Sequence, residues 1–308
     1  MMKFRHVRRG LALLAGVMVA ATAGAQAAAP AAAPAVTAAA PAPAAKPAKP
    51  AAKKPAVPEY KLVLEPKAMD LLKAMSTKIA AAKAMTFTAT VGYEFPSKLG
   101  PPIVYTSRYD VTMQRPDKLK IVMPGDGPAS EYYYDGKTMM AYAPAENLVA
   151  VADAPPTIDG ALMTAYQKAA LFFPFTDLLV EDPYAALIDG AILAFYIGPS
   201  GVVGGVKTEM VAWANKDVFL QIWIGADDKL PRRVRAIYAA DPLQLRNELE
   251  LSNWQIDPSL APETFTSQKA LAAPHIAFKS PASAPTGIKP LVKMAPAKAP
   301  AKPQAKAP

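Results

Sequence analysis

Hydrophobic positions recur with two different periods along the middle of the chain. Within residues 66–83, Met69, Leu72, Met75 and Ile79 are separated by three, three and four positions. This spacing places all four side chains on one face of a helix. Such a stripe is typical of ordinary core, so residues 66–83 are predicted to form a helix that is buried along one side.

The period then changes to two, which predicts strands. Phe87, Ala89, Val91, Tyr93 and Phe95 alternate with mostly polar neighbours, the pattern of a strand with one buried face. Further strands are predicted at 105–114, 118–123, 131–134, 138–143, 148–152, 191–197, 206–214, 218–224, 232–240 and 244–256. Turn residues separate them, which gives a sheet of about ten antiparallel strands.

The stretch 218–238 shows how the two faces of this sheet differ. A β-branched and aromatic run is followed by an acidic turn and then by Arg233 and Arg235, which alternate with Val234, Ala236 and Tyr238. Alternation of this kind predicts a sheet with one solvated face and one apolar face. The apolar face must therefore be covered by another part of the chain or by a ligand.

A mid-chain insert at 157–189 supplies a candidate cover. A helix is predicted at 157–173, followed by helical turns at 177–180 and 183–189, and the insert is rich in large apolar side chains. These side chains need burial, and the apolar face of the sheet is the nearest partner. The predicted fold class is α+β: an open antiparallel half-barrel sheet of about ten strands, covered by an N-terminal helix and by this insert.

Both ends of the chain differ sharply from the middle. Residues 1–25 combine four early basic residues, a short apolar run and small residues, the pattern of a cleaved secretory signal peptide. Residues 26–58 and 280–308 consist largely of Ala, Pro and Lys, which predicts disordered segments. A single ligand-binding domain is predicted at 59–279, and the predicted location is the periplasm.

Charge and cysteine content exclude several functions. All of the net positive charge of +9 belongs to the ends, because residues 59–269 carry twenty basic and twenty-five acidic residues. Nucleic-acid binding by a basic folded face is therefore not expected. There is no cysteine, which removes disulfides, thiol catalysis and thiolate metal sites. The basic ends could instead contact an anionic envelope surface.

Recognisable catalytic chemistry is missing from the sequence. The two histidines are His6, in the signal region, and His275, and no metal, phosphate or dinucleotide motif occurs. Most carboxylates adjoin Pro or Gly, as expected for turns; they include Asp117, Asp126, Asp135, Asp159, Asp182, Asp189 and Asp257. No enzyme activity, catalytic residue, metal or cofactor is predicted. A hydrolase that uses two of Asp126, Asp135, Glu181 and Asp182 is the less favoured alternative.

Several segments resemble a bacterial family of predicted periplasmic proteins of unknown function. They are RPDKLKIVMPGDG at 115–127, YYYDGKTMMAYAP at 132–144, DLLVEDP at 177–183, the turn at 198–205 and QIWIGADDKLPRRV at 221–234. The resemblance implies a fold similar to the lipoprotein carriers LolA and LolB, in which helices lie over a concave sheet that holds acyl chains. Where relatives often carry Cys and His, this chain has Thr208 and Met210, so no redox or metal role is implied there.

Binding of an apolar ligand is the leading functional hypothesis. The ligand would be a lipid, an acyl chain or a lipoprotein, held by apolar burial. The candidate ligand-binding residues are Phe87, Val91, Tyr109, Val111, Ile121, Leu162, Tyr166, Phe173, Phe175, Ile222 and Ile224. The alternative is a non-catalytic envelope interaction or sensor module that is tethered by the cationic tails. Neither the ligand nor the oligomeric state can be named from the sequence.

Overall fold

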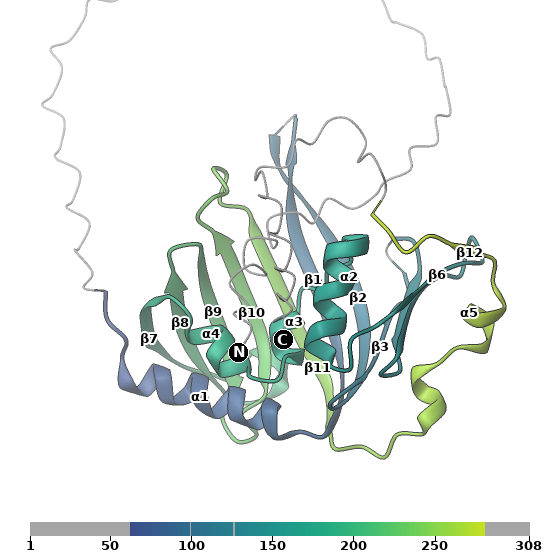
Figure 1. The fold of residues 1–308 in the computed structure, drawn as a ribbon. Helices are drawn as coiled ribbons and strands as arrows, with labels where there is room; N and C mark the ends of the chain where they lie inside the picture. The colour runs from purple at the N-terminus through teal and green to yellow at the C-terminus, as the bar shows by residue number, and fades with distance from the viewer. Residues whose placement is uncertain (1–61, 99, 126, 281–308) are drawn as a thin grey trace, which may run out of the picture. The chain divides into compact units, whose positions relative to one another are not determined.

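A single large sheet organises the protein (Figure 1). The computed structural model describes residues 62–98, 100–125 and 127–280, and within them the sheet has twelve strands. The strands are β1 (Ala84–Ser97), β2 (Gly100–Gln114), β3 (Lys118–Met123), β4 (Ser130–Tyr134), β5 (Thr138–Ala143), β6 (Leu148–Asp153), β7 (Ala191–Ser200), β8 (Thr208–Asn215), β9 (Val218–Gly225), β10 (Pro231–Tyr238), β11 (Arg246–Ile256) and β12 (His275–Ile276). The predicted signal peptide and the two predicted Ala/Pro/Lys tails lie almost wholly outside the described residues.

The strand order shows that the sheet is open. Its order is β12-β6-β5-β4-β3-β2-β1-β11-β10-β9-β8-β7, and every pair is antiparallel except β12 with β6. The sheet thus consists of two antiparallel series that meet where β1 pairs with β11. The predicted α+β class and the open antiparallel sheet are confirmed. The predicted number of about ten strands was low, partly because β12 is too short to show an alternating pattern.

Helix α1 (Pro66–Ala81) packs on what we call the inner face of the sheet, the face that carries Phe87 and Ile222. Pro66 suits the first turn of a helix because its missing N–H has no partner to lose there. Leu72, Met75 and Ile79 are buried in the same core as the strands. The predicted apolar stripe is therefore core, although Met69 is only partly buried.

Three further helices, α2 (Ile158–Ala169), α3 (Thr176–Leu179) and α4 (Pro183–Ile188), form a helical cover over the inner face. Their position in front of the strands can be followed in Figure 1. The Thr157 hydroxyl accepts a hydrogen bond from the Gly160 N–H and caps α2. The predicted continuation of this helix to residue 173 is wrong. Ala170 adopts a left-handed φ of 55°, and Pro174 disfavours helical backbone at the residue before it.

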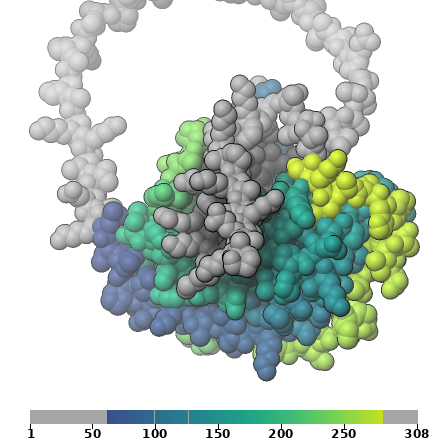
Figure 2. Space-filling view, in the orientation of Figure 1, coloured from purple at the N-terminus to yellow at the C-terminus, as the bar shows by residue number. Residues whose placement is uncertain are grey.

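The outer face of the sheet has a small core of its own. Helix α5 (Gln268–Ala272) places Ala270 against Tyr133, Met140 and Tyr142 of β4 and β5. Figure 2 shows the C-terminal segment, coloured yellow, along one margin of the described residues and α1 along another. The sequence did not predict α5 or β12. Strands β4 and β5 are consequently covered on both faces, not on one.

Short segments of chain pair with both edges of the sheet. At one edge, the Ala194 N–H of β7 donates to the Val63 carbonyl, and the Glu65 N–H donates to the Ala194 carbonyl. At the other edge, His275 and Ile276 pair with Val149 and Ala150 of β6. These contacts satisfy backbone groups that an edge strand otherwise leaves open to pairing with another chain.

Candidate functional site

An aromatic cluster joins the helical cover to the inner face of the sheet. The ring of Phe175, just before α3, lies 5.6 Å from Phe87 and 5.4 Å from Tyr109, both in edge-to-face geometry. Phe173 stacks at 6.0 Å from Phe175 and also approaches Tyr132 on β4. Such ring geometries add stability beyond area burial. The cluster fixes the segment between α2 and α3 against strands β1, β2 and β4.

The structure gathers most of the predicted ligand-binding residues into one core. Ten of the eleven belong to the buried cluster that is shared by the sheet, α1 and the helical cover. They are Phe87, Val91, Tyr109, Val111, Ile121, Leu162, Phe173, Phe175, Ile222 and Ile224. Tyr166 is half-buried and contacts the Phe172 ring at 6.4 Å. The sequence analysis missed Tyr132 and Trp254, whose ring stacks on Phe87 at 4.5 Å.

A small apolar cavity lies within the helical cover. Its volume is about 20 Å³, whereas pockets for small ligands are about 300–1,000 Å³. The lining residues are Asp159, Leu162, Met163, Tyr166, Leu171, Phe172, Phe173, Thr176 and Val180. Three predicted residues, Leu162, Tyr166 and Phe173, thus line it, but no strand residue does. Around Phe87 and Ile222 the inner face of the sheet is closed by packed side chains.

Arg115, in the β2–β3 turn, connects the sheet to the helical cover. Its Nη1 donates a hydrogen bond to the Leu179 carbonyl at 3.2 Å. Among the described residues, the buried Nε and Nη2 atoms of Arg115 have no hydrogen-bond partner. Burial lowers the pKa of this guanidinium, and the negative charges of Asp159 and Glu181 partly oppose that effect. A partly desolvated charge therefore lies at the edge of the helical cover.

Asp159, in the first turn of α2, makes a second polar connection at the same edge. Its Oδ1 accepts a hydrogen bond from the Glu181 N–H at 3.1 Å. Burial raises the pKa of the Asp159 carboxyl, and the nearby Glu181 carboxylate adds to this effect. The assignment of Asp159 to simple turn chemistry was incomplete. Its contact with Glu181 spans 22 positions and could not be read from its neighbour Gly160.

A larger hollow lies away from these residues. It encloses about 480 Å³ and is lined by residues 80–84, Gln114, Arg115, Asp257, Pro258 and Leu260. It is an open depression beside the end of α1, and no predicted ligand-binding residue lines it. Asp257 is occupied there, because its Oδ1 accepts hydrogen bonds from the Lys83 and Ala84 N–H groups. The small cavity in the helical cover is therefore the better candidate site.

The carboxylates considered for a hydrolase are occupied in turns and caps or are exposed. Asp135 Oδ1 accepts from the Lys137 and Thr138 N–H groups, and Asp182 caps α4 through the Ala185 N–H. Glu181 is exposed, and Asp126 lies outside the described residues. No group of side chains suited to hold a metal ion occurs within residues 62–98, 100–125 and 127–280. None of the helices in these ranges is long and apolar enough to cross a membrane.

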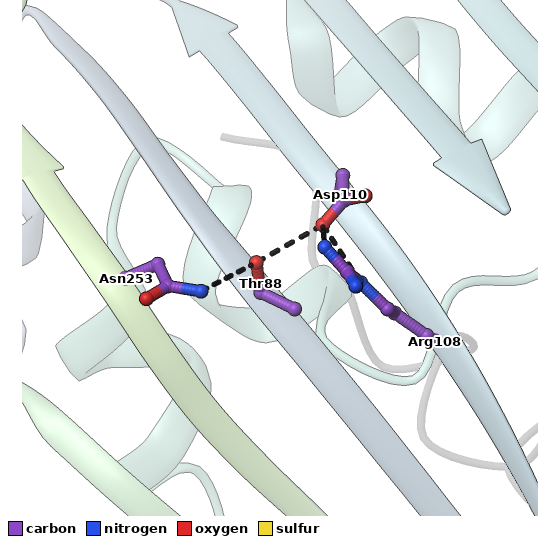
Figure 3. Close-up of polar contacts among 4 residues, drawn as sticks. All are labelled: Thr88, Arg108, Asp110 and Asn253. Atoms are coloured by element: carbon purple, nitrogen blue, oxygen red, sulfur yellow. Dashed lines mark hydrogen bonds and ion pairs between the residues drawn. The ribbon is translucent and has the colours of Figure 1, made fainter. Parts of the chain in front are cut away.

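The outer face carries polar networks instead. Asn253 on β11 donates to Thr88 Oγ1 at 3.2 Å, and Thr88 donates to Asp110 Oδ1 at 3.0 Å (Figure 3). Arg108 Nη2 donates to the same carboxylate oxygen at 2.9 Å. The network connects three neighbouring strands on the side opposite to Phe87. The predicted division into a solvated face and an apolar face therefore holds in the centre of the sheet.

These features define an α+β protein with an open sheet and an apolar inner face beneath helices. Residues 68–279 match the family described as "Predicted periplasmic protein (DUF2092)", and the chain belongs to this family. The family predicted from the sequence is thus confirmed. The family description also places the protein in the periplasm, the predicted location. A comparison with curated proteins finds no match.

Several solved structures are similar in part. MucB is 12% identical, with 67% of this chain and 64% of MucB covered, and a TM-score of 0.39. The lipoprotein LppX of Mycobacterium tuberculosis is 12% identical, with 64% and 99% covered and a TM-score of 0.41. A LolA superfamily protein from Nitrosomonas europaea is 9% identical, with 65% and 97% covered and a TM-score of 0.29. The fold class rests on the strand order and not on these similarities.

Proposed function

We propose that this periplasmic protein is a non-catalytic carrier that binds an apolar ligand between the inner face of the sheet and the helical cover. The ligand class is a lipid, an acyl chain or the acylated end of a lipoprotein. One observation carries the proposal: the interface between sheet and cover is apolar and aromatic throughout its centre, where Phe175 contacts Phe87 and Tyr109. Each methylene of an acyl chain buried there would gain about 0.8 kcal/mol.

Ligand entry requires the helical cover to move, because the cavity of about 20 Å³ is too small for an acyl chain. Apart from α2, which has 12 residues, the cover is made of short helices, since α3 has 4 residues and α4 has 6. Short helices have little stability of their own and depend on their packing. Displacement of the segment that contains Phe173 and Phe175 would expose Phe87, Tyr109 and their neighbours to a ligand.

Lipid analysis of the protein tests this proposal directly. The protein is purified from the periplasm without detergent, and co-purified lipid is identified by native mass spectrometry and by solvent extraction. Calorimetric titration with laurate then measures binding of a defined fatty acid. Absence of bound lipid together with absence of laurate binding would contradict the proposal.

A matched pair of variants locates the ligand. Leu162→Phe places a larger side chain in the small cavity, and we expect it to weaken laurate binding about tenfold through overpacking. Ile237→Phe enlarges a half-buried side chain on β10 that does not line the cavity and serves as the control. Equal effects of both substitutions would place the ligand elsewhere.

The basic ends support a second candidate function, attachment to an anionic envelope surface. Residues 1–58 and 270–308 contain fourteen Lys or Arg and no acidic residue. Salt weakens this electrostatic attraction, and at 0.1 M ionic strength the screening length is about 10 Å. A chain that lacks residues 28–58 and 281–308 should lose salt-sensitive binding to vesicles that contain phosphatidylglycerol. Unchanged binding would contradict attachment through the tails.

A further inference from the structure

The hairpin of β1 and β2 extends beyond both of its neighbouring strands. Strand β1 pairs with β11 only as far as Tyr93, which lies opposite Asn247. Strand β2 pairs with β3 only from Asp110 onward. The pairs between these limits and the turn therefore form a ribbon of two strands, which reaches past the neighbouring strands in Figure 1. We call residues 94–98 and 100–104 the hairpin tip.

The hairpin tip exposes large apolar side chains on both of its faces. Phe95 is 38% exposed, Ile103 is 49% exposed and Val104 is 61% exposed. Phe95 lies opposite Ile103, whereas Val104 lies opposite Glu94 on the other face. An isolated ribbon of two strands is marginal in water and gains nothing from displaying such residues. Because neither face is covered by the described chain, these side chains suit an apolar partner.

A second hairpin places another apolar residue at the same end of the sheet. Leu243, in the turn between β10 and β11, is 59% exposed. Arg246 at the start of β11 connects the two hairpins, because its N–H donates to Glu94 Oε2 at 2.9 Å and its Nε donates to Glu94 Oε1 at 2.7 Å. The tips of both hairpins are thereby held as one surface.

Both acidic side chains of the two hairpin tips, Glu94 and Asp241, accept hydrogen bonds. The hydrogen bond and charge of Arg246 lower the pKa of Glu94, and the charge of Arg246 balances that of the Glu94 carboxylate. The Asp241 carboxylate accepts hydrogen bonds from the Leu243 and Leu245 N–H groups. Lys98 is exposed and adds a positive charge. The surface is therefore apolar, and the charges of Glu94 and Asp241 are balanced by those of Arg246 and Lys98.

We propose that the hairpin tip, together with Leu243, inserts into the surface of a phospholipid bilayer. Aliphatic side chains suit the acyl boundary, and Tyr93 and Tyr105, whose rings stack at 5.7 Å, suit the headgroup level behind them. A tip without net negative charge is not repelled by an anionic leaflet. This inference goes beyond ligand binding, because the tip shares no residue with the cavity in the helical cover.

The C-terminal end of the described chain agrees with this orientation. Helix α2 starts where the Ile158 N–H donates to Pro116, at the end of β2 opposite to the hairpin tip. Its far end therefore points toward the tip, and there the Ser280 N–H donates to the Lys168 carbonyl. Residues 281–308, which carry five Lys and no acid, follow directly. The cationic segment thus begins on the side that would face the bilayer.

A single fluorescent label tests insertion. Because the chain contains no cysteine, Val104→Cys provides one attachment site for the environment-sensitive dye NBD. The matched control is Val202→Cys in the β7–β8 loop, where Val202 is 87% exposed at the opposite end of the sheet. Vesicles of phosphatidylethanolamine with phosphatidylglycerol should shift the NBD emission of the first protein to the blue and leave the second unchanged. If the NBD emission of the Val104→Cys protein does not shift to the blue although the protein is bound to vesicles, the proposal is overturned.

Serine substitutions measure the contribution of the tip. Ile103→Ser combined with Val104→Ser should lower vesicle partitioning at least about tenfold, while Val202→Ser should have no effect. Circular dichroism checks folding, and Val104→Ser alone serves if the double variant is unstable. Unchanged partitioning, or tip-dependent capture of an envelope protein without vesicle binding, overturns the proposal. Laurate titration of the same variants separates this outcome from failure of the carrier function.

Discussion

Arg115 Nη1 donates a hydrogen bond to the carbonyl oxygen of Leu179, which lies 64 positions later in the chain. This bond joins the β2–β3 turn to the end of α3. Two positions after Leu179, the Glu181 N–H donates a hydrogen bond to the Asp159 carboxylate. The first bond attaches the cover to the sheet, and the second joins two parts of the cover. Leu179 and Glu181 are two positions apart, so residues 179–181 are where these polar contacts of the cover can be tested.

Replacement of Arg115 by Met should loosen the helical cover without a large loss of global stability. A hydrogen bond to a charged group contributes about 1.5–3 kcal/mol, but removal of a partly buried charge also removes its desolvation cost. We expect amide hydrogen exchange in residues 178–181 to become about tenfold faster, as measured by mass spectrometry. Arg233→Met, which removes an outer-face partner of Glu250, is the control. Unchanged exchange in the Arg115 variant would contradict a fastening role.

The aromatic cluster predicts a large loss of stability for Phe175→Ala. Phe175 is fully buried and contacts rings on both β1 and β2. Removal of a buried phenyl ring costs about 3–5 kcal/mol of unfolding free energy. Urea unfolding followed by circular dichroism measures the loss. Phe219→Ala, at an exposed position on β9, should change stability by only about 0.5 kcal/mol; similar losses for both would argue against Phe175 as the centre of the core.

The pKa of Asp159 predicts a particular dependence of stability on pH. Burial raises the pKa of this carboxyl, so the folded state binds its proton more tightly than the unfolded state. The unfolding free energy of the wild type should therefore fall as pH rises from the ordinary aspartate pKa through the raised value. Asp159→Asn keeps an oxygen acceptor but does not titrate. Its stability relative to the wild type should increase across this window, as urea unfolding at a series of pH values would show.

Asp257→Asn provides a control of opposite sign. Hydrogen bonds from the Ala84 and Lys83 N–H groups lower the pKa of Asp257. Its ionised form therefore stabilises the fold above the ordinary aspartate pKa, and this contribution disappears as pH falls through the lowered value. The wild type should exceed the Asn variant in stability at neutral pH and converge with it in acid. If the stability of both Asn variants relative to the wild type changed with pH in the same direction, local pKa shifts would not explain the stability differences.

Local patterns were sufficient for much of the sheet and for many candidate residues. The period of two placed Phe87 and Tyr109 on the face that the structure buries. It failed for Tyr132, Tyr133 and Tyr134, which are all buried: Tyr132 and Tyr134 lie in the inner-face core, and α5 covers Tyr133 on the outer face. An unbroken apolar run carries no information about which faces are covered. The contribution of Tyr132 to the aromatic cluster was missed for this reason.

The sequence by itself determined most of the elements of this protein, because hydrophobic period and turn residues act over a few neighbouring positions. It also determined the family, the uneven charge and the lack of cysteine chemistry. Only the tertiary structure decided which elements meet. The pairing of β1 with β11 places Glu94 beside Arg246, 152 positions away, and leaves the hairpin tip without neighbours. Such contacts depend on closure of long loops and on packing of the whole core, which no local pattern encodes.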